Sequence, residues 1–310
     1  MTASPNVAAS VKQRLLNLAK KRGVEFNRLL TRYGIERLLY RLSRTCHERQ
    51  FVLKGAILFQ IWRPEPHRPT KDVDLLGSGT PDETSLAKIF AEICAVDVED
   101  DGVDFAADSV RTEPIREGNS YLGVRIKLMG RIGVARIPIQ VDVGFGDSVV
   151  PAPQTAELPA LLGHAPPRLR AYCRETVVAE KLHAIVDLGF TNTRMKDYFD
   201  LWFLSVNFAF DSVTLAEAIA ATFDRRSTTI PDALPTGLTD EFANDSTKRA
   251  QWLGFLHRAG LQTEEIDLEK AVSVIGAFLV PPLAMARTRD LRKLSWPPGG
   301  PWQTVPEPAQ

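Results

Sequence analysis

The stretch from Arg68 to Leu75 constrains the fold more than any other part of the chain, because it carries two aspartates two residues apart among apolar side chains. In a β-strand, residues two apart point to the same face. Val73 and Leu75 would then enter a core while Asp72 and Asp74 stand side by side on the opposite face. Two adjacent carboxylates repel each other, so this pattern predicts a strand whose polar face meets a cation.

A second run, residues 137–145, alternates in the same way and places Asp142 on its polar face. If the two strands are neighbours, three carboxylates meet at one spot. Mg²⁺ prefers oxygen ligands and leaves positions open for phosphate oxygens. We therefore predict Asp72, Asp74 and Asp142 as metal ligands, with Asp142 either a second-metal ligand or the general base of a phosphoryl or nucleotidyl transfer. A salt bridge or an acidic turn at a strand end remains the alternative for the Asp-x-Asp pair.

The segment before this strand predicts a phosphate-binding turn. Residues 51–58 suggest a short strand, a Lys54-Gly55 turn and a helix that begins near Ala56. A glycine at this point lets backbone N–H groups approach a phosphate. The following loop brings Arg68 and Thr70 to the Asp-x-Asp strand. The forked donors of Arg68 suit a triphosphate, although the residue could equally lie on the surface.

Composition indicates a globular protein without a membrane span. The 310 residues are 44% hydrophobic and 25% charged, and no run of eighteen uninterrupted apolar residues occurs. The N-terminal residues lack the apolar stretch of a secretory signal. Three widely spaced cysteines without a Cys-x-x-Cys pair suggest reduced thiols rather than a zinc site. We expect a cytoplasmic location and no membrane partner.

The zero net charge hides a basic N-terminal third. Residues 11–63 contain thirteen lysines and arginines against three glutamates, whereas residues 81–115 contain ten acids against two basic residues. This asymmetry suggests a polyanion partner on one face, or two patches that solvate separate surfaces. Arg37, Arg41 and Arg44 recur at helical spacing and are expected on the exposed side of a helix, where they could contact a nucleic-acid backbone.

The order of elements predicts an α+β fold with a mixed sheet. Helices are expected over 10–22 and 82–95, with two more inside 26–47 that are split near Gly34. Three strands joined by hairpins imply antiparallel pairing beside the Asp-x-Asp strand; they are expected over 103–112, 119–129 and 134–145.

Residues 146–170 contain five prolines and no periodicity, which predicts a linker into a mostly helical second part. In that part, Lys196 and Asp200 stand four apart on a helix and predict a helical salt bridge. We expect three regions, with the nucleotide-handling core in residues 1–155, a helical domain in 156–296 and an irregular Pro-rich tail in 297–310.

Four motifs together resemble the AbiEii/MenT nucleotidyltransferase toxins of AbiE-type (type IV) toxin–antitoxin pairs, over about residues 50–205. The motifs are Lys54-Gly55-Ala56, Arg68-x-Thr70-x-Asp72-x-Asp74, Ala179-Glu180-Lys181-Leu182 and Arg194-x-Lys196-Asp197-x-x-Asp200-Leu201. The resemblance implies that Asp72 and Asp74 bind Mg²⁺ and the nucleotide phosphates. It also implies that Lys181 contacts the nucleotide and that Asp200, or Asp197 in its place, completes the site. Arg194, Lys196 and Asp197 are assigned to nucleotide binding on the same resemblance.

Two departures from the family pattern concern the phosphate contacts. The family's glycine turn is often followed by a hydroxyl residue, whereas Ala56 stands here, so the turn would offer backbone N–H groups alone. Thr70 replaces a serine that many members carry, which keeps the hydroxyl.

The resemblance implies a Mg²⁺-dependent enzyme that transfers a nucleotide from an NTP to RNA, at the 3′ acceptor end of tRNA, and so blocks translation. It further implies an AbiEi-type antitoxin partner with a winged helix-turn-helix domain. The alternatives are a transferase acting on a protein or a small molecule, such as an AMPylating enzyme or an antibiotic adenylyltransferase, and a catalytically silent nucleotide-binding module. The basic segment over residues 11–63 favours RNA.

Overall fold

The computed structural model describes residues 6–63, 68–80, 82–117, 120–261, 266–290 and 292–305. The chain forms two compact units, one made of residues 1–146 with 154–171 and the other of residues 147–153 with 172–310. The chain therefore passes between the units three times, whereas we expected the core and the helical domain to meet at one boundary, after residue 155. Each unit is described by itself.

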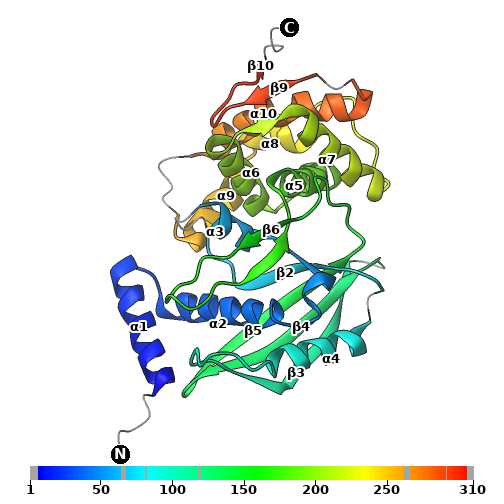
Figure 1. Cartoon of the computed structure of the whole chain (residues 1–310). Helices are drawn as coiled ribbons and strands as arrows, with labels where there is room; N and C mark the ends of the chain where they lie inside the picture. Colours follow the sequence, from blue (N-terminus) through cyan, green and yellow to red (C-terminus); the bar gives the residue numbers. More distant parts are fainter. Residues whose placement is uncertain are drawn as a thin grey trace, which may run out of the picture. The chain divides into compact units, whose positions relative to one another are not determined.

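The first unit is built on a seven-stranded mixed sheet with the strand order β3-β4-β5-β2-β1-β7-β6 (Figure 1). Strands β2 and β5 are parallel, as are β1 and β7, and the other neighbours are antiparallel. The expected α+β class with a mixed sheet is confirmed. The strands are β1 (Phe51–Lys54), β2 (Asp72–Gly77), β3 (Asp104–Glu117), β4 (Ser120–Ile132), β5 (Ala135–Phe145), β6 (Gln154–Glu157) and β7 (Arg168–Ala171).

Helices pack on the apolar face of this sheet. The first unit contains α1 (Val7–Arg22), α2 (Phe26–Leu42), the short α3 (Phe59–Trp62) and α4 (Glu83–Cys94). α2 packs against Ile137 and Ile139 of β5, and α4 places Phe90 edge-on against Phe51 of β1 with ring centroids 5.9 Å apart. Asp82 caps the first turn of α4 through its carboxylate. The opposite face carries Asp72 and Asp74 on β2 and Asp142 on β5.

α2 differs from the two split helices that we expected. It runs unbroken through Gly34. A larger residue would not fit at this position, because a Cβ there would lie 2.9 Å from Ile137 Cγ2 of β5. The glycine therefore serves close helix–sheet packing rather than a helix end.

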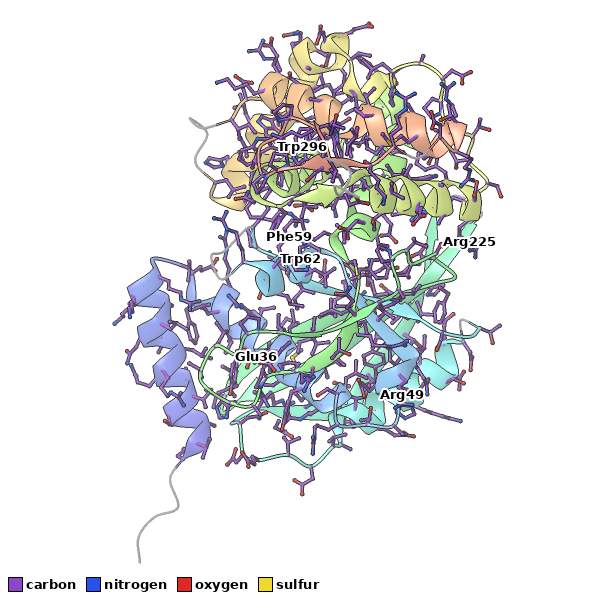
Figure 2. All side chains as sticks on the ribbon, turned by 45° about the horizontal axis from the view of Figure 1, so that its top comes forward. Glu36, Arg49, Phe59, Trp62, Arg225 and Trp296 are labelled. Atoms are coloured by element: carbon purple, nitrogen blue, oxygen red, sulfur yellow. The ribbon has the colours of Figure 1, made fainter. Side chains whose placement is uncertain are left out.

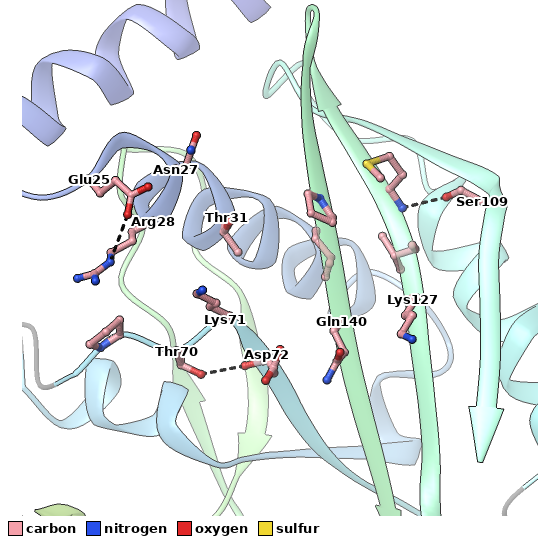
Figure 3. Close-up of a pocket in the computed structure, with 15 residues that line it drawn as sticks. Glu25, Asn27, Arg28, Thr31, Thr70, Lys71, Asp72, Ser109, Lys127 and Gln140 are labelled. Atoms are coloured by element: carbon pink, nitrogen blue, oxygen red, sulfur yellow. Dashed lines mark hydrogen bonds and ion pairs between the residues drawn. The ribbon is translucent and has the colours of Figure 1, made fainter. Parts of the chain in front are cut away.

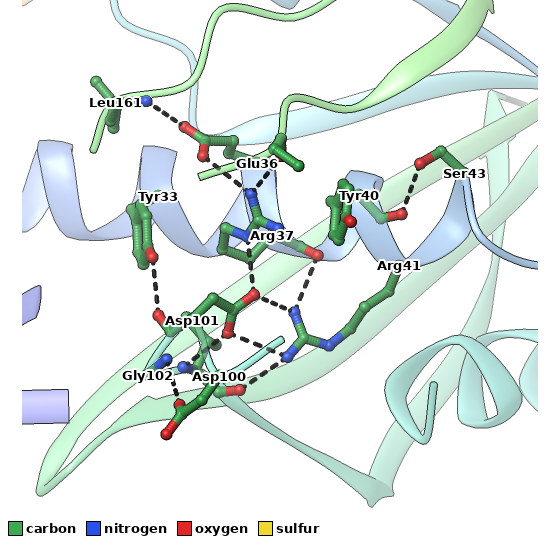
Figure 4. Close-up of polar contacts among 12 residues, drawn as sticks. Tyr33, Glu36, Arg37, Tyr40, Arg41, Ser43, Asp100, Asp101, Gly102 and Leu161 are labelled. Atoms are coloured by element: carbon green, nitrogen blue, oxygen red, sulfur yellow. Dashed lines mark hydrogen bonds and ion pairs between the residues drawn. The ribbon is translucent and has the colours of Figure 1, made fainter. Parts of the chain in front are cut away.

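The expected arginine stripe on the exposed side of α2 is wrong for two of its three members. Arg37 and Arg41 are buried and converge on Asp101, which accepts from Arg37 Nε at 2.8 Å and from Arg41 Nη1 at 2.8 Å (Figure 4). Arg44 is exposed but lies beyond the end of the helix at Leu42. The two buried guanidiniums join α2 to the loop before β3 and are not available for RNA.

Residues 146–170 are also more ordered than the linker that we expected. They contain β6, and β7 begins at Arg168, so this segment adds two strands beside β1. Glu36, labelled on α2 in Figure 2, accepts the Leu161 backbone N–H at 2.8 Å and fixes the loop between these strands.

The second unit is mostly helical. Its helices are α5 (Arg174–Leu188), α6 (Met195–Asn207), α7 (Ser212–Arg225), α8 (Asp240–Asn244), α9 (Ser246–Ala259) and α10 (Leu268–Thr288). A small antiparallel sheet in the order β10-β9-β8 completes it, with β8 (Phe210–Asp211), β9 (Leu294–Trp296) and β10 (Gln303–Thr304).

The expected irregular tail is ordered over its described part. Trp302 stacks on Phe278 with ring centroids 6.0 Å apart, and its indole N–H donates to the Phe278 carbonyl at 2.9 Å. Trp296, labelled in Figure 2, lies 5.0 Å from the same phenylalanine ring. Residues 306–310 of the predicted tail lie outside the described residues.

One described helix, α10, is long and apolar enough to cross a membrane by length and composition alone. Its most apolar window has a mean hydropathy of 1.5 and is half buried inside the protein. Core helices pass the same test, and Phe278 and Leu279 of α10 are completely buried in the second unit.

Candidate active site

A row of charged residues crosses the polar face of the first unit's sheet. Cross-strand pairing aligns one charged residue on each of five neighbouring strands: Lys54 on β1, Asp74 on β2, Asp142 on β5, Arg125 on β4 and Glu113 on β3. Residues directly opposite each other on neighbouring strands have side chains within interaction distance. The two carboxylate strands, β2 and β5, are therefore neighbours as predicted, and Asp74 lies directly opposite Asp142.

Asp72 and Asp74 stand on the same face of β2, two residues apart. The Asp72 side chain is exposed, and Asp74 is half-buried, while Val73 between them is completely buried. Thr70 donates its hydroxyl hydrogen bond to the Asp72 carbonyl at 3.1 Å and so fixes the start of the strand (Figure 3). Arg68 lies half-buried in the segment that enters β2.

Asp142 is held by Arg125 through two parallel hydrogen bonds. Arg125 donates from Nε at 2.9 Å and from Nη2 at 2.8 Å, one bond to each carboxylate oxygen. The hydrogen bonding of Arg125 to the Asp142 carboxylate is the main cause that raises the pKa of the guanidinium. Gln140 adds a weaker bond at 3.2 Å. The negative charge of Asp142 thus already has a matched cation.

The described residues contain no group of three or more histidine, cysteine, aspartate or glutamate side chains placed to hold a metal ion. A metal-ligand role for Asp72 and Asp74 stays a prediction. A ligand or base role for Asp142 stays a prediction, and such a role would require Arg125 to release at least one carboxylate oxygen.

Sequence reasoning missed Arg125 as a partner of the site. The signal was present, because alternation over the predicted strand 119–129 already places Arg125 on a polar face. What the sequence does not give is the register that sets this arginine opposite Asp142.

Gly55 allows the turn after β1 to pass directly beside Asp74. Its φ is 75°, in the region that favours glycine, and a Cβ built on it would lie 1.9 Å from Asp74 Oδ2. Ala56 is buried and begins a short 3₁₀ helix over Ala56–Leu58, as the predicted turn-to-helix transition requires. The glycine turn and the Asp-x-Asp strand therefore meet, as the sequence predicts for a phosphate site.

We expect Gly55→Ala to displace the Asp74 carboxylate and lower nucleotidyl transfer by about tenfold or more, since a shift of roughly 1 Å at a reacting group costs that much. Gly79→Ala is the matched control, because Gly79 also has a positive φ of 90° but nothing lies within 4 Å of the added Cβ. Initial rates and thermal unfolding of both variants check this. If both variants lost activity equally, backbone strain would explain the loss, and the proposed role of the close approach between Gly55 and Asp74 would be wrong.

In the second unit, Lys181 joins two buried carboxylates. Its Nζ lies 2.6 Å from Asp197 Oδ1 and 2.7 Å from Asp200 Oδ2, and both aspartates are at most 1% exposed. Burial alone would raise the pKa of the Asp197 carboxyl, but the charges of Lys181 and then Arg194 outweigh burial and hold that pKa below its ordinary value. Arg194 Nε donates to Asp197 Oδ2 at 2.6 Å.

The expected helical salt bridge between Lys196 and Asp200 is absent from this described helix. Lys196 is exposed, and Asp200 pairs with Lys181 of α5 instead. The structure thus brings together Lys181, Arg194, Asp197 and Asp200 within the second unit and leaves Lys196 at the surface.

Two solved structures are similar to this chain, a candidate nucleotidyltransferase from H. pylori and JHP933 from Helicobacter pylori. The first is 15% identical, with a TM-score of 0.44, and the match covers 82% of this chain and 91% of the other. The second is 16% identical, with a TM-score of 0.44, and the match covers 82% of this chain and 88% of the other. No curated protein matches.

The family described as "Nucleotidyl transferase AbiEii toxin, Type IV TA system" matches residues 37–274, which is more than half of the chain. This range includes every motif named above, from the glycine turn at Gly55 to Asp200. The chain belongs to the AbiEii nucleotidyltransferase toxin family of type IV toxin–antitoxin systems.

Proposed function

We propose that this protein uses Mg²⁺ to transfer a nucleoside monophosphate from an NTP to the 3′ end of an RNA, with the acceptor end of tRNA as the target. The observation that carries this proposal is the pair Asp72 and Asp74 on one face of β2, with the Gly55 turn against Asp74. The family supplies the reaction class and the toxin role, and an antitoxin partner follows from its type IV classification.

The residues present fit a magnesium ion. Mg²⁺ is usually held by one or two carboxylates together with substrate phosphates, so Asp72 and Asp74 suffice without Asp142. When bound, the ion would offset charge on the triphosphate and orient it.

The chain's own groups have separate tasks in this proposal. The turn at Gly55 and Ala56 offers backbone N–H groups to the donor phosphates, and Lys54, opposite Asp74, and Arg68 add positive charge. Transfer also needs a group that takes the proton from the attacking hydroxyl. Asp142 is the carboxylate placed nearest in register to Asp74, with Arg125 holding it in position until it acts.

RNA is favoured over a protein or small-molecule acceptor by the basic segment over residues 11–63, although Arg37 and Arg41 within it are buried. The action of such a toxin on translation places it in the cytoplasm, which we propose as its location. AMPylation and silent nucleotide binding are kept as outcomes of the test.

The test is incubation of the purified protein with total tRNA, Mg²⁺ and each α-labelled NTP in turn, beside Asp72→Asn. Label on tRNA with the wild type alone supports the proposal and names the donor. Label on protein would establish AMPylation instead. NTP binding without any transfer would leave a silent binding module as the better account.

For Lys181, we predict two separable roles, neutralising the buried aspartates and contacting the nucleotide. Lys181→Met should destabilise the second unit by about 3–5 kcal/mol, because it removes the cation that the two buried carboxylates share. The double variant Lys181→Met/Asp200→Asn should recover much of that stability. NTP affinity, measured by calorimetry at a temperature where the protein is folded, should stay low in the double variant. Recovery of both stability and affinity would show that Lys181 acts only as a counter-ion.

A further inference from the structure

A cavity in the first unit opens beside Asp72 and has no assigned ligand. It measures about 670 Å³, within the range of sites for small ligand groups and too small for a nucleic-acid duplex. Residues from α2, the segment before β2, and strands β3, β4 and β5 line it (Figure 3). It therefore lies at the end of β2 where the Asp-x-Asp strand begins.

The cavity exists because β2 is shorter than its neighbour β5. β2 pairs with β5 from Gln140 onward, whereas β4 pairs with β5 from Ala135 onward. Residues 135–139 of β5 are therefore paired with β4 along one edge. Along their other edge, no strand in the described part of the chain pairs with them. Pro138 of that stretch pairs with Met129 of β4, and these two residues form an apolar surface on the same sheet face as Gln140 and Asp72.

The polar lining suits a nucleotide. Asn27 and Gln140 carry amides that both donate and accept, as the edge of a base requires. Lys71 is exposed, points into the space below Thr31 in Figure 3, and makes no hydrogen bond or ion pair with any described residue.

Two further cations at the cavity are held by weak exposed pairs. Arg28 lies 3.7 Å from Glu25, and Lys127 lies 2.7 Å from Glu113, with both cation side chains more than 40% exposed. Exposed ion pairs of this kind contribute little to stability, so a phosphate could replace Glu25 beside Arg28 or Glu113 beside Lys127. Glu25 is the acid paired with Arg28, and Asp72, the other acid of the lining, faces a metal in the proposed function.

The position of the cavity separates the acceptor from the donor. Asp72 lines it and Asp74 does not, because Asp74 lies on the side of the Gly55 turn. A triphosphate held at the turn and by both aspartates would leave the Asp72 side open. Lys71 directly precedes Asp72 and lines the same cavity, so a phosphate bound by Lys71 would lie at the start of the carboxylate strand.

We infer that this cavity binds the single-stranded 3′ end of the RNA acceptor, with its base on Met129 and Pro138 and its phosphates at Lys71 and Arg28. The inference rests on the proposed function, whose acceptor it places. It assigns Lys71 and Arg28 to RNA affinity rather than to NTP affinity.

The test compares two double variants that remove the same charge. Lys71→Ala/Arg28→Ala alters the cavity, and Arg131→Ala/Arg136→Ala removes two exposed arginines of β4 and β5 that do not line it. The Kd of a short fluorescent single-stranded RNA with a free 3′ hydroxyl is measured by anisotropy at several salt concentrations, without NTP. The KM for NTP is measured separately with saturating RNA.

We expect the cavity variant to bind the RNA about tenfold more weakly, with the log Kd–log salt slope reduced by about 0.7 for each lost phosphate contact, and to keep its KM for NTP. The control variant should change less than about threefold, as expected for loss of distant charge alone. Equal weakening in both variants would overturn the inference, and so would a raised KM for NTP with unchanged RNA affinity.

The two proposals fail in distinguishable ways. A wild type that binds RNA through Lys71 and Arg28 but labels no RNA would overturn the proposed reaction and keep the cavity as an RNA site. A wild type that labels RNA while the cavity variant keeps normal RNA affinity would overturn the cavity and keep the reaction.

Discussion

Asp72→Asn is expected to abolish nucleotidyl transfer, with a loss of about 10²–10³-fold or more. The substitution keeps the shape of the side chain and the β2 strand but removes one of the two charges proposed to hold Mg²⁺. Loss of several kcal/mol of transition-state stabilisation corresponds to that range, since 1.4 kcal/mol is a factor of ten. Initial rates with saturating Mg²⁺ and NTP measure it. Asp108→Asn, an exposed aspartate of β3 that does not belong to the charged row, is the control.

Thermal unfolding gives a second readout that does not depend on activity. Without Mg²⁺, Asp72→Asn should lie within about 0.5 kcal/mol of the wild type, because Asp72 is exposed and surface substitutions change stability little. Added Mg²⁺ should raise the Tm of the wild type, since a ligand that binds only the folded state stabilises it, and should raise that of the variant far less. An equal Mg²⁺-dependent rise in both proteins would exclude Asp72 as a ligand, even if activity were lost.

The sequence predicts the carboxylate strand well because alternation is a local property. A period of two over 137–145 places Asp142 on the polar face whatever the rest of the chain does. It does not reveal that Arg125 binds Asp142, because the pairing of β4 with β5 depends on the hairpin register. The glycine turn was predicted from its spacing, whereas its contact with Asp74 follows from the antiparallel pairing of β1 with β2.

The wrong prediction on α2 has a clear physical cause. Arginines at helical spacing usually lie on a solvated face, because burying a charge without a partner is costly. Here the partner is Asp101, which lies 60 residues beyond Arg41 in the chain and belongs to a segment that the sequence marks only as acidic. The acidic stretch over 81–115 and the basic segment over 11–63 are thus linked inside the first unit through these residues, which helical periodicity could not show.

The cluster around Asp101 leads to the largest stability effect that we expect. Its carboxylate accepts hydrogen bonds from Arg37, from both terminal nitrogens of Arg41 and from the Val103 backbone N–H, and the residue is 1% exposed (Figure 4). Asp101→Asn removes the anion that the two buried guanidiniums share, and leaves only Arg37 with a second carboxylate, Glu36 at 3.4 Å. Breaking a buried ion pair from one side costs about 3–5 kcal/mol. Urea unfolding should show this loss, and Asp97→Asn, which changes an exposed aspartate of the same loop, should lie within about 0.5 kcal/mol of the wild type.

The pH dependence of unfolding separates the charge of Asp101 from its shape. Burial by itself would raise the pKa of Asp101, but the hydrogen bond and charge of Arg41, followed by Arg37, hold that pKa below its ordinary value. A carboxyl whose folded pKa is depressed adds stability above its unfolded pKa of about 3.9, and this stability is lost as the pH falls through the folded pKa. The wild type should therefore lose stability more steeply below about pH 4 than Asp101→Asn, so that the two unfolding free energies converge in acid. Parallel curves would mean that the asparagine disturbs packing alone and that the ion pairs of Arg37 and Arg41 add nothing to stability.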